Sequence, residues 1–477
     1  MVAVDGPGMP PASTPRRPAL SDMTATLSEK TESLTGWGRT DPSNALLCAP
    51  NSIEQIQATV AAATPGSLIA RGLGRSYGNP AQCAGGRVLE LMALDHIHLD
   101  PANGCITCGT GASLDAVLRV IVPAGFFLPV TPGTRNVTVG GAIAADVHGK
   151  NHHGEGSFVN HVQWLNLVNG SGQLRQLSPN DPATAEAFWA TAGGMGLTGV
   201  IVEACFRLIP ISSSLVSVDT TRFRDLDALM AAMVEADARF RYSVAWVDSL
   251  HAQGRGVLTC GNHASREHVQ GEQSSSTDPL HYDPKALAGA PSLLPGGMLN
   301  TWTVRAFNEA WYRKSPKQRE GQFQAISPYF HPLDGVNNWN RIYGPAGFLQ
   351  YQFAVPDAAA HLVATTLEAL RRISAPSFLT VLKRFGPGNP GPLSFPMPGW
   401  TLAADVSCAV PGLFELLDQL DEHVAEAGGR LYLAKDSRQS AAMLERSYPR
   451  LNEWRQQRAL LDPRGVFSSD LARRVKL

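Results

Sequence analysis

The sequence lacks a long apolar run, a strong net charge and a dense cysteine pattern. Its longest apolar stretch, residues 120–130, is broken by Pro123 and Gly125 and falls short of the ~18 residues that a membrane-spanning helix requires. The formal net charge of −1 offers no general attraction to nucleic acid. Seven cysteines among 477 residues are too few for a disulfide framework. Cys105 and Cys108 form a lone CxxC pair, for which strand thiols are the favoured interpretation.

The sequence also shows no recognisable export signal. Arg16 and Arg17 could open a twin-arginine signal, but residues 18–30 supply no apolar segment after them. Residues 1–33 are rich in Pro, Ser, Thr and Ala, a composition that buries too little apolar surface to fold. We therefore expect a disordered N-terminal extension and no export by an ordinary signal.

Glycine, in contrast, is plentiful and gathers in three loops. It supplies 45 of the 477 residues, with dense clusters at 72–78, 133–141 and 193–199. Exposed backbone N–H groups in such loops can cradle phosphate oxygens, although each loop alone could equally be a tight turn between core strands. The stretch 131–154, around the second cluster, is expected to be buried loop and strand. Three clusters within the mixed α/β segment 34–210 suit one large, phosphate-bearing cofactor.

The pattern changes at about residue 211. The length and the apolar content of 44% suit about two or three domains, and we expect a second domain over 211–428. Within it, residues 265–300 are rich in Ser, Gly and Pro with little periodicity, which predicts a mobile loop. A C-terminal segment, 429–477, follows.

Four segments together give the chain a family resemblance. They are RGLGRSYG (71–78), PGTRNVTVGGAIAADVHGKNHH (132–153), GGMGLTG (193–199) and DPRGVFSSD (462–470). In this combination the sequence resembles the FAD-linked oxidases typified by vanillyl-alcohol oxidase and alditol oxidase. The resemblance implies an α+β, two-domain fold: an FAD-binding domain of the PCMH type, and a substrate domain with an antiparallel sheet flanked by helices. It also implies that the C-terminal segment returns to the FAD-binding domain.

Further segments, such as HGKNHH (148–153) and LYLAKDSR (431–438), are similar to the branch that acts on a polyprenyl-phosphate ribose. This implies oxidation of the ribose 2-hydroxyl to a 2-keto sugar, followed by a separate NADH-dependent reductase, on the way to the arabinose donor of cell-wall arabinan. A lipid-linked substrate implies peripheral contact with the cytoplasmic membrane. The sequence does not indicate on which side of the membrane this contact lies. The alternatives are a sugar or alditol oxidase that uses O₂, and a flavin-binding protein without turnover.

The resemblance implies FAD as the cofactor, with its pyrophosphate on the N–H groups of the first glycine loop. Some relatives attach FAD covalently through a histidine in this loop. Here Arg75 occupies that position and cannot form the link, so we predict non-covalent FAD. The residues placed at the cofactor are Ala70, Arg71, Gly72, Leu73, Gly74, Arg75, Ser76, Tyr77, Gly78, Asn79, Gly133, Thr138, Val139, Gly140, Gly141, Ala145, Asp146, Val147, His148, Ile201 and Tyr432.

Two residues are implied to be catalytic. Lys435 is the predicted base, or the group that stabilises the developing alkoxide, because burial lowers the pKa of a lysine toward neutrality; the alternative is a surface lysine paired with Asp436. His148 is expected against the isoalloxazine ring, and the alternative is a hydrogen-bonded loop histidine. No metal site is expected at His148, His152 and His153, because no acidic ligand pattern accompanies them.

The remaining predictions concern the substrate. The 265–300 loop is expected to close over it. The side chains expected to line its site include two lysines for the phosphate, for which an exposed strand-end charge is the alternative. For the tyrosine, the tryptophan and the two glutamines, core packing is the alternative. The expected substrate residues are Tyr77, Lys150, Trp246, Phe330, Gln350, Gln352, Lys383 and Ala403.

Overall fold

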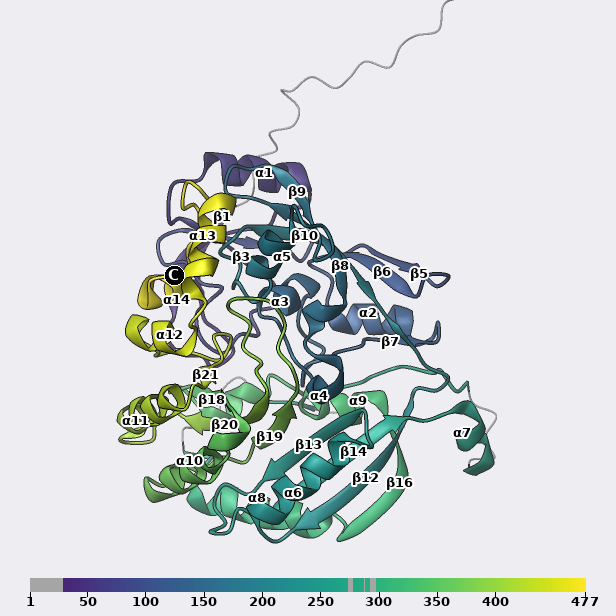
Figure 1. Ribbon diagram of the computed structural model, residues 1–477. Helices are drawn as coiled ribbons and strands as arrows, with labels where there is room; N and C mark the ends of the chain where they lie inside the picture. Colours follow the sequence, from purple (N-terminus) through teal and green to yellow (C-terminus); the bar gives the residue numbers. More distant parts are fainter. Residues whose placement is uncertain (1–28, 273–277, 287, 292–296) are drawn as a thin grey trace, which may run out of the picture.

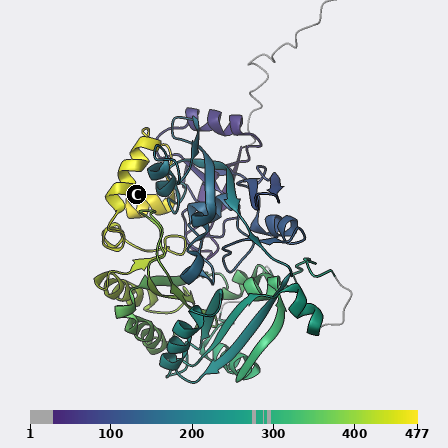
Figure 2. The ribbon, with the colours of Figure 1, turned by 45° about the vertical axis from the view of Figure 1, so that its right-hand side comes forward.

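The computed structural model describes residues 29–272, 278–286, 288–291 and 297–477 (Figure 1). The chain forms two lobes: an N-terminal lobe, drawn in purple to blue, and a second lobe around one large sheet, drawn in teal to green. Turning the molecule by 45° keeps the C-terminal helices, in yellow, beside the N-terminal lobe (Figure 2). The α+β, two-domain fold is therefore confirmed.

The N-terminal lobe contains two sheets. The first has the order β1-β2-β4-β3, with β1 Glu29–Leu34, β2 Ser43–Cys48, β4 Arg87–Glu90 and β3 Leu68–Arg71. The second has the order β5-β6-β10-β8-β9, with β5 Ile97–Asp100, β6 Cys105–Gly109, β10 Val200–Arg207, β8 Val162–Val168 and β9 Leu174–Leu177. A short pair, β7 Phe126–Phe127 and β11 Ile209–Pro210, precedes the second lobe.

The helices of this lobe are short, and some of them begin at side-chain caps. Ser52 caps α1 (Ile53–Ala62) and Ser113 caps α2 (Leu114–Ile121), each by accepting a backbone N–H of the first turn. The other helices are α3 Val139–Ala144, α4 His152–Glu155 and α5 Ala185–Thr191.

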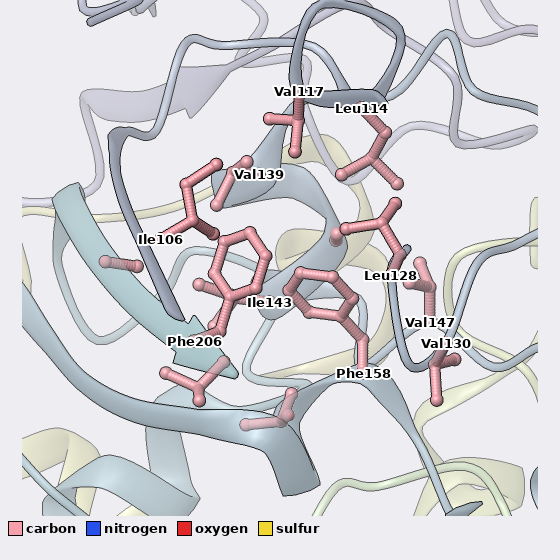
Figure 3. Close-up of a cluster of buried hydrophobic side chains, with 14 of the residues drawn as sticks. Ile106, Leu114, Val117, Leu128, Val130, Val139, Ile143, Val147, Phe158 and Phe206 are labelled. Carbon is pink, nitrogen blue, oxygen red and sulfur yellow. The ribbon is translucent and has the colours of Figure 1, made fainter. Parts of the chain in front are cut away.

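The prediction of loop and strand over 131–154 was wrong at α3. There Thr138 accepts a hydrogen bond from Gly141 N and begins a helix. Two glycines, with low helix propensity, hid this helix in the sequence. Its apolar side, with Val139 and Ile143, packs into the core with Ile106 and Phe206 (Figure 3). Packing against the core therefore holds a helix that propensity alone disfavours.

The second lobe is built on one antiparallel sheet with the order β16-β12-β14-β13-β19-β20-β18-β21. Its strands are β16 Gln318–Ala325, β12 Leu215–Phe223, β14 Gly256–His263, β13 Tyr242–Val247, β19 Thr380–Phe385, β20 Gly399–Ser407, β18 Phe348–Val355 and β21 Arg430–Leu431. One face is covered by α6 Leu226–Asp237, α10 His361–Arg372 and α11 Leu413–Glu426. The remaining helices of the lobe are α7 Arg266–Glu272, α8 Thr301–Lys314 and α9 Ile326–Phe330.

Alternation along the strands gives the sheet two different faces. On β13, Ala245 and Val247 belong to the core under the helices. Val244 and Trp246 point the other way, into a cavity between the lobes. The sheet therefore supplies both a core and one wall of a site.

The C-terminal segment connects the two lobes. After β21, which pairs with β18, the chain forms α12 Ala441–Ser447, α13 Leu451–Leu461 and α14 Asp470–Val475. The fully buried Trp454 donates its indole N–H to the carbonyl oxygen of Ala190 in α5 at 2.9 Å, and Phe467 forms a bridge with Leu68 of β3. The tail thus packs on the N-terminal lobe.

Two predicted segments differ from the structure. The expected disordered extension, 1–33, is too long, because Glu29–Leu34 pairs with β2; residues 1–28 lie outside the described part. The predicted loop at 265–300 contains α7, and Ala288–Gly289 (β15) pairs with Val336–Asn337 (β17); residues 273–277, 287 and 292–296 lie outside the described part. Among the residues described, no helix is long and apolar enough to cross a bilayer.

Candidate active site

A cavity of about 710 Å³ lies between the two lobes. Its wall combines the three glycine loops, the open face of the large sheet, and Tyr432 and Lys435 from the C-terminal segment. The structure therefore brings together segments that are separated by more than 300 residues in the sequence. Both predicted catalytic residues and all the predicted substrate residues line this cavity.

The first glycine loop presents unused backbone donors. Within the described chain, none of the N–H groups of residues 72–76 has a hydrogen-bond acceptor, although all five residues line the cavity. Arg71 fixes the loop from behind by donating to the carbonyl oxygens of Thr35 at 2.8 Å and Ala81 at 3.0 Å. Consecutive free N–H groups on a rigid turn form an anion-binding concavity.

Glycine is required in this loop for space. A Cβ on Gly72 would lie 2.2 Å from Thr138 Oγ1, so the first two glycine loops can approach each other only without a side chain there. Gly74 has φ +62°, a conformation that residues with a Cβ resist. The wall also includes the small side chains of Ala144, at the end of α3, and of Ala145, its C-cap, together with Ile201 of β10.

Four of the predicted cofactor residues do not line the cavity: Gly78, Asn79, Val139 and Asp146. They support the wall from behind. A Cβ on Gly78 would meet Asp436 O at 1.8 Å, and Val139 is part of the apolar core. Asp146 is fully buried and accepts hydrogen bonds from Asn389 Nδ2 at 2.7 Å and Ser394 Oγ at 2.5 Å. Burial raises the pKa of Asp146, and these hydrogen bonds oppose that shift.

Apart from the exposed Lys314, three lysines line the cavity: Lys150, Lys383 and Lys435. None of them has a carboxylate within ion-pair distance in the described part of the chain. Burial lowers the pKa of Lys435 to about 7, that of Lys150 to about 7 and that of Lys383 to about 8. Since buried cations without counter-charges are costly, the lysines indicate an anionic ligand.

Lys435 is held over an aromatic ring. Its Nζ lies 3.7 Å from the centroid of Tyr77, a cation–π geometry. It does not pair with Asp436, whose carboxylate accepts from Arg474 Nη2 at 2.9 Å; the alternative of a surface ion pair is therefore wrong. Desolvation sets the lowered pKa of Lys435, Asp405 opposes that shift and Lys383 adds to it.

Asp405 is a residue that sequence reasoning missed. Its Oδ1 accepts a hydrogen bond from Gln350 Nε2, which also reaches Tyr77 Oη at 3.3 Å, while Oδ2 has no partner within the described residues. Burial raises the pKa of Asp405 to about 7, with Gln350 and then Lys435 opposing the shift. The sequence feature that could have pointed to Asp405 is that it is the one carboxylate in the otherwise largely apolar strand 399–407.

His148 is present as a neutral, buried ring. Desolvation, followed by the charge of Lys383, holds its pKa well below the usual range. Its Nε2 lies 3.0 Å from Gln352 Nε2, so the histidine nitrogen accepts and the proton is on Nδ1. The Nδ1 donor has no partner in the described chain and is available to a ligand. The ring packs against Phe385, with centroids 4.9 Å apart.

The predicted substrate residues come from neighbouring strands of the sheet. Gln352 of β18 lies opposite Ala403 of β20, and Ala403 lies opposite Val381 of β19, two residues before Lys383. Trp246 of β13 is fixed by donating its indole N–H to Phe378 O at 2.9 Å. One face of four strands therefore carries most of this set.

Lys150 and Phe330 line the cavity from outside the strands of the large sheet. The Nζ of Lys150 donates to the carbonyl oxygen of Tyr329 and lies 4.2 Å from that residue's ring centroid. Phe330, only 2% exposed, packs on Phe127 with ring centroids 4.9 Å apart. Phe330 is therefore as much a core residue as a wall residue.

Comparisons with known proteins agree with this geometry. The family described as FAD binding domain matches residues 44–178, and the family D-arabinono-1,4-lactone oxidase matches residues 409–475. The decaprenylphosphoryl-β-D-ribose oxidase of Mycolicibacterium smegmatis is 42% identical over 455 residues, which are 94% of this chain and 98% of that protein. The chain belongs to the decaprenylphosphoryl-β-D-ribose oxidase family.

More distant relatives share part of the chain. An uncharacterized protein of Streptomyces coelicolor is 38% identical over 380 residues, 76% of this chain and 100% of that protein. Cytokinin dehydrogenase 10 of Oryza sativa subsp. japonica is 29% identical over 164 residues, which are 32% of this chain and 29% of that protein.

As a member of the decaprenylphosphoryl-β-D-ribose oxidase family, the chain is an FAD-dependent oxidoreductase that acts on a CH–OH group, as predicted. The cavity fits FAD, because the N–H groups of 72–76, which have no acceptor in the described chain, suit its diphosphate, and the small side chains of Ala144 and Ala145 suit a planar ring. Bound there, FAD would supply the hydride acceptor for oxidation of the substrate carbon. The protein has to supply position, exclusion of water and a proton acceptor.

Proposed function

We propose that the chain oxidises the ribose 2-hydroxyl of decaprenylphosphoryl-β-D-ribose, which is the first half of an epimerisation toward the arabinose donor of cell-wall arabinan. The observation that carries this proposal is the group of Lys150, Lys383 and Lys435, which have no ion-pair partner among the described residues and share one cavity with the FAD loop. Similarity over 94% of the chain to an oxidase of that name supports it.

In this proposal Lys435 takes the proton of the reacting hydroxyl. A base with a pKa of about 7 is neutral in a large fraction of molecules at neutral pH, which general-base catalysis requires. The ring of Tyr77 lies against the amine, and the charge of Asp405 raises its pKa against desolvation. The Nδ1–H of His148 faces no protein acceptor in the described residues and is free to donate to the sugar or to the flavin.

Lys383 and Lys150 are proposed to bind the substrate phosphate. Both line the cavity, and neither has a carboxylate partner in the described chain. A bound phosphate would favour the charged forms of both amines and raise their pKa values. It would also offset the cost of holding two cations under the protein surface.

The test is anaerobic addition of decaprenylphosphoryl-ribose to the purified FAD-loaded protein, followed by product analysis with a dye acceptor. We expect bleaching of the flavin absorbance and a 2-keto product. No bleaching with any sugar would indicate a flavin-binding protein without turnover. The match to the D-arabinono-1,4-lactone oxidase family over 409–475 favours one second candidate, an oxidase of free sugars; turnover restricted to free sugars, with stoichiometric peroxide, would replace the first proposal by this one.

Three further parts of the proposal follow from the substrate and from Arg75. We propose that an NADH-dependent reductase consumes the keto product, and that the protein works peripherally at the cytoplasmic membrane because its substrate is lipid-linked. We also propose that FAD is bound non-covalently, because the guanidinium of Arg75, 3.9 Å from the ring centroid of Trp37, offers no nucleophile for a flavin link. Release of all flavin from acid-denatured protein would support this last point; flavin that stays on the chain would refute it.

A further inference from the structure

Helix α8, Thr301–Lys314, exposes three large aromatic side chains. Trp302 is 78% exposed, Phe307 44% and Trp311 43%. Large aromatic residues normally bury most of their surface, so a group of three on one 14-residue helix marks a surface that another body covers.

The opposite side of α8 already anchors the helix to the sheet. Val304 and Asn308 are buried, and Asn308 Nδ2 donates to Asp248 Oδ1 at 2.7 Å. Tyr312 Oη donates to the carbonyl oxygen of Phe223, at the end of β12, at 3.3 Å. The helix also begins with a capping box at Asn300. Its folding therefore does not depend on the three exposed aromatics.

At ~100° per residue, the side of α8 away from the anchor forms one continuous surface, which we call the outer face. It consists of Trp302, Thr303, Ala306, Phe307, Ala310, Trp311, Arg313 and Lys314, and all of these are exposed. No carboxylate lies on this face of the fully described helix. Glu309, the one acidic residue of α8, lies beside it and bonds to Arg255 and Arg313. The outer face is thus aromatic, small and basic.

The outer face is continuous with the mouth of the cavity. Trp311 and Lys314 line the cavity while being exposed to solvent, and so does Arg319 of the neighbouring edge strand β16. The cavity therefore reaches the surface at the C-terminal end of α8. From the sheet, the cavity wall includes the apolar Val244 and Val257 as well as Thr220 and Thr259, a mixed surface along which a hydrocarbon chain can lie.

We propose that the outer face of α8 docks on a bilayer that contains anionic lipids, so that the cavity opens onto the membrane. Tryptophan and phenylalanine are favoured at the level of the lipid headgroups, and basic residues add attraction to anionic lipids. The small residues Ala306 and Ala310 let the helix lie flat between its aromatic edges. A polyprenyl-phosphate substrate would then enter from the bilayer; this last step rests on the proposed function, whereas the docking itself does not.

The test uses the full-length, FAD-loaded protein and vesicles of phosphatidylcholine with or without phosphatidylglycerol, separated by sedimentation. The informative variant is Ala306→Asp/Ala310→Asp, which places two carboxylates on the outer face without touching the cavity wall. The matched control is Ala58→Asp/Ala62→Asp, with the same change at two exposed alanines four residues apart on α1, at the far end of the molecule (Figure 1).

We expect the wild-type protein and the α1 control to sediment with vesicles that contain phosphatidylglycerol. The partition coefficient of the α8 variant onto these vesicles should be at least about tenfold lower. Trp302→Ser should also weaken binding. The proposal is overturned if the wild-type protein does not bind anionic vesicles that contain no protein, which is the result expected if the outer face binds another protein. It is also overturned if the α8 variant binds the vesicles as well as the α1 control does.

A second measurement separates this proposal from the proposed function. Flavin content and turnover of a short-chain, water-soluble polyprenyl-phosphate ribose should be unchanged in the α8 variant, while turnover of the long-chain substrate in vesicles should fall. If vesicle binding depends on α8 but neither substrate is oxidised, the docking surface stands and the proposed substrate is wrong. Equal turnover of the vesicle-borne substrate by the variant and the α1 control would overturn entry from the bilayer.

Discussion

The two walls of the cavity are built on different principles. The cofactor wall, formed by the glycine loops, offers backbone N–H groups and open space, and the residues of each loop lie close together in the sequence. The substrate wall offers charged and amide side chains from β18, β19 and β20 and from the C-terminal segment, which only the folded sheet brings together. A substitution that adds a side chain to the cofactor wall should therefore remove cofactor binding altogether. A substitution on the substrate wall should remove only the role of the side chain that is replaced.

The largest effect is expected on the cofactor wall. Gly72→Val should abolish flavin binding and with it all turnover, because the new Cβ would lie 2.2 Å from Thr138 Oγ1 and force the two loops apart. The flavin-to-protein ratio of folded protein, checked by circular dichroism, measures this. Gly154→Ala is the control, since nothing lies within 4 Å of a Cβ there. A fully loaded Gly72→Val protein would contradict the space argument.

On the substrate wall, Lys435→Met should separate chemistry from cofactor binding. We expect turnover to fall about 10²–10⁴-fold, as for loss of a general base, with flavin content unchanged. Rapid-reaction measurement of flavin reduction reports the step directly. Lys285→Met, at a lysine whose side chain is 77% exposed, should leave the rate unchanged. A loss of less than fivefold would show that another group takes the proton.

Lys383→Met is expected to have an intermediate effect. Loss of one charge-assisted contact to phosphate corresponds to about 1.5–3 kcal/mol, which raises KM for the phosphorylated substrate roughly 10–100-fold and leaves kcat less affected. Comparison of the phosphorylated and unphosphorylated sugars tests the assignment. An equal rise of KM for both sugars would place the phosphate elsewhere.

The smallest expected effect is a shift of the pH profile in Asp405→Asn. The carboxylate of Asp405 raises the pKa of Lys435 against desolvation, so its removal should lower that pKa. The rising limb of kcat/KM, which lies near pH 7 for a base with a pKa of about 7, should therefore move to lower pH. Asp227→Asn, at an exposed position of α6, should not move it. A shift to higher pH would show that Asp405 does not act through its charge on Lys435.

The cofactor wall was largely predictable from the sequence because glycine spacing acts locally. Residues 70–77 could be placed at FAD from one motif, and all of them line the cavity. Gly78, Asn79, Val139 and Asp146 belong to the same motifs but point away from the cavity, because a contiguous motif also contains the residues that brace the loop. The helix α3 was missed because packing against the core, and not propensity, holds it.

The substrate wall was harder to predict from the residues themselves. Lys150, Lys383 and Lys435 could each have been surface charges, and only the resemblance to a family grouped them. Asp405 was missed, since one aspartate in a strand carries no periodic signal. The exposed aromatics of α8 were missed as well, because Trp302, Phe307 and Trp311 read equally well as core residues until their exposure is measured.

The sequence by itself determined the cofactor class, since the conformation of glycine loops depends on the residues within them. The tertiary structure decided which lysines share a cavity, which of them lose charge and where that cavity meets the surface. These properties depend on distances between residues hundreds of positions apart and on the water that folding removes from around them, and no local pattern contains either quantity.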